Sequence, residues 1–349
     1  MSIFSAYFPD IFQDVLNVEF KYEKNIYAYF MDARKESLKR YDALMTEKEF
    51  KRLSGKYAES NKSFNVFENI FSKDLIEFQK EQDPTITVIS YVGADALRKN
   101  LNGLFEEGAP LGGQQAFREF EIPMDFKMDN KAVIDYATGY NLKLADDIAN
   151  SLSNEIKFAM IQELKQGTSI PKLKKAILEV HNRGHLVTVK PKFNPLGEKI
   201  REGYQYYIAP DRYAEIIARS ESIRWTAEAR VSAYEATGVV PKCRLETAGD
   251  KRVCPICERL DGTEYPIKES YGIIPIHCMC RCTMIPMIDM DGDIKVPGMR
   301  VDEAGDFLIT AIRLQAAIPQ SVKNTALINV IRSFGLDEDE LLEEGVDGL

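Results

Sequence analysis

Five cysteines and a histidine fall within 29 consecutive residues of a chain that has only 6 cysteines and 3 histidines. The stretch contains Cys254 and Cys257, then nineteen other residues, then His277, Cys278, Cys280 and Cys282. A C-x2-C pair followed at this distance by an H-x2-C pair has the spacing of a closed zinc site, in which two tight turns offer ligands to one ion. The spacing therefore predicts that this stretch folds around a metal.

Chance clustering and a pair of disulfides are the alternatives to a metal site. Chance is a poor account because only Cys243 lies outside the cluster. No apolar run approaches the roughly 18 residues needed to cross a bilayer, and the first ten residues lack the basic and apolar regions of a signal peptide. We therefore expect a protein that stays in the cytosol where it is made, where thiols stay reduced, and this favours zinc over disulfides.

The ligand set is less constrained than the presence of the metal. Neighbouring residues of an extended segment point to opposite sides, so Cys278, Cys280 and Cys282 share one side. The predicted quartet is Cys254, Cys257, His277 and Cys280, with Cys282 as the substitute for one of them. Four protein ligands leave no open position for water or substrate, so the predicted zinc is structural.

Three runs of sequence carry a resemblance to a known family. They are I-A-R-S-E at 217–221, T-A-G-D-K-R-V-C-P-I-C-E-R-L-D-G at 247–262 and P-I-H-C-M-C-R-C at 275–282. In this order they resemble the phage head morphogenesis family, the minor head proteins related to the F protein of phage Mu. The resemblance spans about residues 131–286. It departs at Ser220, where threonine is usual, and at Cys278, in a position that proline often occupies.

The resemblance implies a structural virion protein, present in the host cytoplasm during assembly, that binds the portal protein, other head proteins and the capsid interior. Packaged double-stranded DNA is a further partner left open, and neither a membrane nor a small-molecule substrate is expected. No enzyme is predicted, because the chain lacks H-E-x-x-H, G-x-S-x-G and G-x-x-x-x-G-K-[ST]. Asp261 and Glu264 are read as turn residues. A phage toxin is a weaker alternative, since only about 60 residues follow Asp289.

Charge is unevenly distributed along the 349 residues, whose formal net charge is -9. Residues 172–201 hold eight basic and two acidic residues, a local balance of +6, whereas acidic residues dominate 337–347. The basic residues are Lys172, Lys174, Lys175, Arg183, Lys190, Lys192, Lys199 and Arg201. The stretch is either a solvated face or a surface that meets DNA or an acidic partner, so a zinc-containing nucleic-acid-binding protein is the alternative function.

Periodicity predicts an α+β fold that is predominantly α-helical, with long helices, a small β-hairpin arm and a zinc-knuckle-like module. Helices are expected at 25–45, 63–78, 130–166, 170–180, 211–238 and 302–334, and strands at 186–190 and 203–208 around a turn at 194–197. The Gly-rich run at 103–113 is expected to be a loop.

The expected organisation has four parts: an N-terminal helical region (1–125), a helical core with the basic arm (126–238), the zinc module (239–291) and a C-terminal helical region with the acidic tail (292–349). Trp225 falls off the main apolar stripe of its helix and is a candidate for a second contact surface. His181 and His185 are not predicted to bind metal, because Gly184 interrupts the helix between them.

Overall fold

The structure is a computed structural model that describes residues 9–58, 83–120, 125–189, 192–193 and 199–288. Over these residues the chain is mostly helical, with small antiparallel sheets and a cluster of Cys and His side chains, which confirms the predicted fold class. The expected helices at 63–78 and 302–334 and the acidic tail lie outside the described residues. Among the described helices, none combines the length and apolarity needed to cross a membrane.

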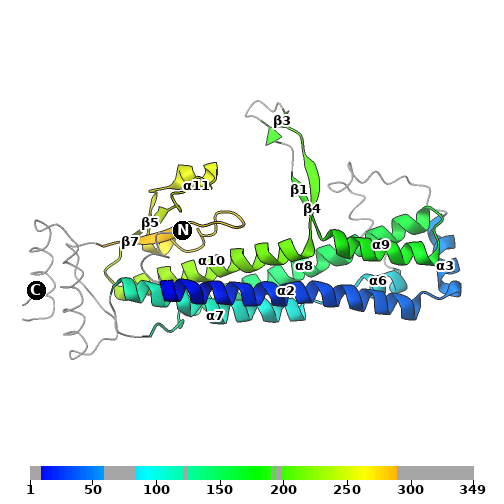
Figure 1. The fold of residues 1–349 in the computed structure, drawn as a ribbon, viewed down its shortest axis with the longest axis horizontal. Helices are drawn as coiled ribbons and strands as arrows, with labels where there is room; N and C mark the ends of the chain where they lie inside the picture. Colours follow the sequence, from blue (N-terminus) through cyan, green and yellow to red (C-terminus); the bar gives the residue numbers. More distant parts are fainter. Residues whose placement is uncertain (1–8, 59–82, 121–124, 190–191, 194–198, 289–349) are drawn as a thin grey trace, which may run out of the picture. The chain divides into compact units, whose positions relative to one another are not determined.

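Contacts divide the chain into two compact units, each made of segments far apart in sequence. Of the described residues, the first unit takes those within 1–20, 103–138 and 218–349, and the second takes those within 21–102 and 139–217. Long helices contribute residues to both units (Figure 1): α2 (Pro9–Leu44), α7 (Asp95–Glu119), α8 (Lys131–Lys165) and α10 (Pro210–Thr237). The helices predicted at 25–45, 130–166 and 211–238 are thus confirmed, and α2 begins earlier than expected.

The second unit adds the shorter helices α3 (Glu47–Ala58), α6 (Pro84–Ser90) and α9 (Ile170–Arg183). Asp83 caps α6, because its carboxylate accepts the N–H of Thr85 and also binds the Arg52 guanidinium at 2.9 Å through both oxygens. Helix α9 begins behind Ser169 with a proline in its first turn, as predicted, and ends at Gly184, whose φ is 82°.

The predicted β-arm follows α9 in the same unit. Strand β1 (His185–Val189) pairs antiparallel with β4 (Tyr204–Ile208), and β2 (Lys192–Phe193) pairs with β3 (Lys199–Arg201). Figure 1 shows β1 and β4 leaving the end of α9 as a two-stranded ribbon. A Cβ at Gly184 would lie 2.0 Å from the carbonyl oxygen of Ile208, so only glycine lets the two strands meet at the root of the arm.

The loop predicted at 103–113 is wrong, because this run lies inside α7 and contains Pro110. A Cβ at Gly112 would lie 2.2 Å from the carbonyl oxygen of Thr226 in α10, and one at Gly113 would lie 2.1 Å from the ring of Phe126. The glycines therefore permit close packing within the first unit. Tertiary contact overrides the weak helix propensity of the run.

Trp225 is not a surface residue but part of the core of the first unit. Its side chain is fully buried, and its ring meets Phe105 and Tyr136 edge to face at centroid distances of 5.3 and 5.9 Å. The expected second contact surface at this residue is therefore wrong.

Buried polar groups join α7 to α10 in the same unit. The Arg230 guanidinium donates to Glu119 at 2.5 Å and to Gln115 at 3.2 Å, and the Tyr234 hydroxyl donates to the second oxygen of Glu119. A buried charge is tolerated when it is paired and hydrogen-bonded in this way.

The rest of the first unit is a small module after α10. A three-stranded antiparallel sheet has the order β6-β5-β7, formed by β5 (Lys242–Glu246), β6 (Glu264–Pro266) and β7 (Thr283–Met287). The short helix α11 (Pro255–Leu260) and the 3-10 turn η1 (Ile267–Glu269) lie between its strands in sequence. This sheet carries the two segments that contain the predicted metal ligands.

Candidate metal centre

The first knuckle is the N-terminal turn of α11. Cys254 is the N-cap, with extended backbone angles, and its sulfur accepts the backbone N–H of Cys257 at 3.4 Å. Pro255 occupies the first turn, where its fixed φ suits a helix start and its missing N–H costs no hydrogen bond. The turn therefore brings the thiols of Cys254 and Cys257 to one side.

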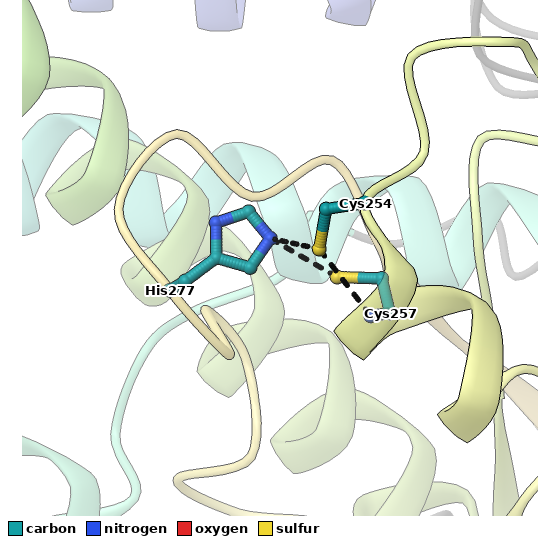
Figure 2. A group of neighbouring side chains, drawn as sticks. All are labelled: Cys254, Cys257 and His277. Carbon is teal, nitrogen blue, oxygen red and sulfur yellow. Dashed lines mark hydrogen bonds between the residues drawn. The ribbon is translucent and has the colours of Figure 1, made fainter. Parts of the chain in front are cut away.

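The second knuckle, the turn that contains His277 and Cys280, supplies the imidazole. The Nε2 atom of His277 lies 3.2 Å from the sulfur of Cys254 and 3.1 Å from that of Cys257, and Figure 2 shows the three side chains converging. Ligand atoms around a tetrahedral zinc are separated by roughly 3.6 Å, given the usual zinc–sulfur and zinc–nitrogen distances. The two nitrogen–sulfur distances are therefore about 0.4–0.5 Å shorter than the spacing around a zinc ion, and all three donors lie within 4.8 Å of one another.

The tautomer of His277 that this structure favours is the one that a zinc ligand needs. Its Nδ1 lies 2.7 Å from the backbone carbonyl oxygen of Cys278, so Nδ1–H donates there and the lone pair of Nε2 faces the sulfurs. Burial lowers the pKa of His277, but the Cys278 carbonyl and the thiolates of Cys280 and Cys254 raise it by more. A hydrogen bond of this kind fixes the ring orientation that metal-binding histidines need.

Cys280 and Cys282 form a second triad with Cys257. In each triad, Cys254–Cys257–His277 and Cys257–Cys280–Cys282, all ligand atoms lie within 4.8 Å of one another. Cys257 belongs to both, so the five side chains form one cluster. Cys278 is exposed and belongs to neither triad. The cluster thus contains every residue of the predicted ligand set, including the substitute Cys282.

The cysteine thiols of the cluster differ in pKa, because they accept different hydrogen bonds and are buried to different extents. The backbone N–H of Cys257 lowers the pKa of Cys254. A hydrogen bond from the Cys282 thiol, helped by the backbone N–H groups of Cys282 and Ile276, lowers the pKa of Cys280 to about 5 despite burial. Burial raises the pKa of Cys257 to about 12. Backbone N–H groups aimed at sulfur stabilise thiolates, which are the form that binds zinc.

Two interactions brace the knuckles. Both oxygens of Asp250 accept from the Arg281 guanidinium, at 2.6 and 2.7 Å, and this ties the loop before Cys254 to the loop after Cys280. The Arg281 charge holds the pKa of Asp250 well below its usual range. The hydroxyl of Ser220 in α10 accepts the backbone N–H of Met279 at 3.0 Å. The loop that carries His277 is therefore fastened on two sides.

The segment before the second knuckle is also attached to α10. The N–H of Gly272 donates to the buried carboxyl of Glu228 at 2.6 Å, and the Tyr271 hydroxyl donates to Glu235 at 2.7 Å. Burial raises the pKa of Glu228 to about 7, although the Gly272 N–H and the Arg224 charge act in the opposite direction. The Gly272 N–H therefore stabilises the ionised carboxylate, whereas burial favours the protonated form.

The sequence motifs did not reveal what Ser220, Asp250 and Arg281 do. Each lies inside a run that carried the family resemblance, and that position was the only available signal. Asp261 acts as the turn residue that was expected, because its carboxylate accepts the N–H of Thr247 at 2.8 Å where α11 ends.

The predicted basic surface is only partly described, and several of its charges are engaged locally. Lys174 binds Asp42 at 2.6 Å, Lys199 binds Glu202 at 2.8 Å, and Lys175 lies 3.7 Å from Glu179. The Arg183 guanidinium lies 4.7 Å from the ring centroid of Tyr207. Lys172 is exposed on α9. The side chains of Lys190, Lys192 and Arg201 are not among those that the structure describes.

His181 and His185 line a pocket in the second unit, together with Glu155 and Tyr213. Neither histidine belongs to a metal-binding group among the residues that the structure describes. Burial, with the charges of Arg34 and Arg40, lowers the pKa of His181 to about 4, and burial raises the pKa of Glu155 to about 7. His185 stacks on Tyr213 with ring centroids 4.2 Å apart, so its role is to pack the root of the arm.

Comparison with known proteins identifies the segment that contains both the arm and the cluster. Residues 154–285 match the family model described as Phage Mu protein F like protein. No curated protein and no solved structure matches the chain significantly. The family is one of phage head morphogenesis, and its members are structural head proteins. Over residues 154–285 the chain is similar to the Phage Mu protein F-like family.

Proposed function

We propose that this chain is a minor head protein of a phage, incorporated into the virion, which acts by binding other head proteins and not by catalysis. The observation that carries the proposal is that residues 154–285, the segment matched by the family model, contain both the β-arm and the Cys/His cluster. A compact module with a Cys/His cluster and a two-stranded ribbon suit a protein that orders its neighbours during assembly.

Zinc is the proposed ion, held by Cys254, Cys257 and His277 with Cys280 as the fourth ligand and Cys282 as its substitute. Sulfur and imidazole donors in this number suit zinc, and an ion with four protein ligands has no position left for water. The module is small and contains only short strands and a short helix, so the metal would supply much of its folding free energy. The proposed role of the metal is therefore to hold the fold.

The portal protein is the proposed partner of the arm, through an acidic surface that would complement the basic residues near the arm's tip. Packaged DNA is the second candidate, favoured by the same basic residues.

Mass spectrometry of purified particles tests the proposal. A minor head protein is expected in washed, mature heads at a constant and low number of copies relative to the major capsid protein. Presence in the infected-cell lysate but absence from heads and from assembly intermediates would instead favour an effector directed at the host. The alternative of a zinc-containing nucleic-acid-binding protein predicts release of the chain when DNA is removed from the particles.

A further inference from the structure

Three exposed tyrosines stand within the five residues of β4. Tyr204, Tyr206 and Tyr207 are 53%, 45% and 43% exposed. Side chains two residues apart in a strand lie on the same face, so Tyr204 and Tyr206 share a face and Tyr207 lies on the other. The rings of Tyr204 and Tyr206 are stacked, with centroids 6.0 Å apart and an interplanar angle of 28°. One face of the ribbon therefore presents an aromatic pair to solvent.

The two faces of the ribbon differ in what covers them. On one face, Arg183 lies over the ring of Tyr207 and satisfies it by a cation–π contact within the chain. On the other, the register places Val187 opposite Tyr206, so the neighbour of the aromatic pair is apolar. A two-stranded ribbon is marginally stable by itself in water, and exposed tyrosines are typical of protein interfaces. The Tyr204–Tyr206 face is thus the one suited to a partner.

The positive charge of the arm limits which kinds of molecule its tyrosine face can bind. Residues 183–208 contain five Lys or Arg and two Glu, a net charge of +3. A second copy of the ribbon would bring the same positive charge against it, which disfavours pairing between two arms. The apolar Val187 opposite Tyr206 offers nothing to a phosphate backbone, whereas it suits the apolar part of a protein interface.

We propose that the Tyr204–Tyr206 face of the β1–β4 ribbon is a docking surface for a protein partner that offers an apolar groove rimmed by carboxylates. The rings enter the groove, their hydroxyls reach its wet edge, and the basic residues of the arm meet the carboxylates. This assignment rests on the proposed function, under which the partner is another head protein. The assignment extends the proposed function by naming the side chains that make the contact.

Hydroxyl-radical oxidation read by mass spectrometry tests the assignment without any substitution. The free protein, heads without DNA and DNA-filled heads receive matched radical doses, calibrated with an added reporter peptide. Oxidation of Tyr204 and Tyr206 is expected to be at least about fivefold lower in both kinds of head than in the free protein, since docking removes their exposed ring area from solvent.

The possible oxidation results distinguish a failure of the docking surface from a failure of the proposed head incorporation. Equal oxidation in free protein and heads overturns the docking surface while leaving head incorporation intact. Protection only in DNA-filled heads overturns it in favour of DNA. Absence of the chain's peptides from both heads contradicts the proposed function itself, and the docking surface with it.

A variant pair gives an independent readout. Tyr204→Ser with Tyr206→Ser removes the proposed contact, whereas Tyr207→Ser makes the same chemical change on the opposite face of the same strand. The double variant is expected to enter heads at least about tenfold less, and the single variant at the parental level. Equal incorporation of the double variant and the parent overturns the assignment. Circular dichroism verifies that both variants keep the helical content of the parent.

Discussion

The hydroxyl of Ser220 accepts a hydrogen bond from the backbone N–H of Met279 at 3.0 Å. Met279 has a φ of 61°, a left-handed backbone conformation that residues other than glycine rarely adopt. Its neighbours in sequence include His277 and Cys280, which belong to the Cys/His cluster. A residue of a long helix thereby stabilises the strained turn that brings the second knuckle to the first. The same position holds threonine in the family that the chain resembles, and threonine offers the same acceptor.

Replacement of Ser220 by alanine should loosen this turn. The N–H of Met279 would lose its acceptor, and loss of such a part-buried hydrogen bond costs about 1 kcal/mol. The expected result is a lower midpoint of unfolding and a faster release of zinc to a chromogenic chelator. Ser220→Thr is the matched control and should behave as the parent. If Ser220→Ala releases zinc at the parental rate, the hydrogen bond does not hold the second knuckle.

The metal content of the chain is the most direct prediction. The purified protein is expected to carry about one zinc ion per molecule by elemental analysis, because the two triads share Cys257 and form one cluster. Cys257→Ser should lose the ion, since Cys257 belongs to both triads. Hydrogen exchange should then increase across residues 239–288 but not around Leu152 in α8, which is buried in the second unit.

Cys278→Ser is the control for that experiment, because Cys278 is exposed and outside both triads. It should retain zinc and parental hydrogen exchange. Protein that contains no zinc, or a disulfide between Cys254 and Cys257, would contradict the metal proposal.

Cys280 and Cys282 are expected to differ in their effect on zinc affinity. Cys280→Ser should weaken binding by at least about tenfold in competition with a chelator, because the N–H groups of Ile276 and Cys282 point to the Cys280 sulfur. Cys282→Ser should weaken it less. The reverse order would make Cys282 the fourth ligand and Cys280 the neighbour that supports it.

The Cys/His cluster and the arm were predictable because their signals are local. Ligand spacing within two tight turns and alternation within two short strands need no knowledge of distant residues. The helical run at 103–119 was not predictable, because its glycines are explained only by the approach of Thr226 and Phe126. Trp225 was misassigned for the same reason, since the rings that bury it come from α7 and α8. The hydrogen bonds of Ser220 and Asp250 to the second knuckle likewise join segments that are far apart in sequence.

Glu228 should make the stability of the first unit depend on pH. Its pKa in the folded chain is raised from 4.5 to about 7, so its contribution is present below about pH 4.5 and is lost as pH rises through 7. A shift of this size corresponds to roughly 3 kcal/mol. Glu228→Gln keeps a carbonyl oxygen for the Gly272 N–H and removes the ionisation.

Urea unfolding at pH 5.5 and pH 8 measures this effect as a difference between variant and parent. Glu228→Gln is expected to gain stability relative to the parent as pH rises, by about 2 kcal/mol across this range. The exposed Glu258 offers the control Glu258→Gln, which should show no such trend. A constant difference between Glu228→Gln and the parent would show that Glu228 does not ionise in this range.

The final prediction concerns the basic residues of the arm. Reversal of Lys190, Lys192 and Lys199 to glutamate should abolish capture of the chain by purified portal protein at low salt, because an acidic partner surface would then repel the arm. Any DNA binding by the parent is expected to be weak, independent of sequence and steeply dependent on salt. Loss of portal capture without a change in DNA binding supports docking on protein. If the reversal instead lowers both DNA affinity and its salt slope while portal capture persists, the arm's cations contact phosphates. The matched comparison reverses Lys172 and Lys175 of α9, which lie outside the arm, and parental portal capture by this variant would confine the contact to the arm.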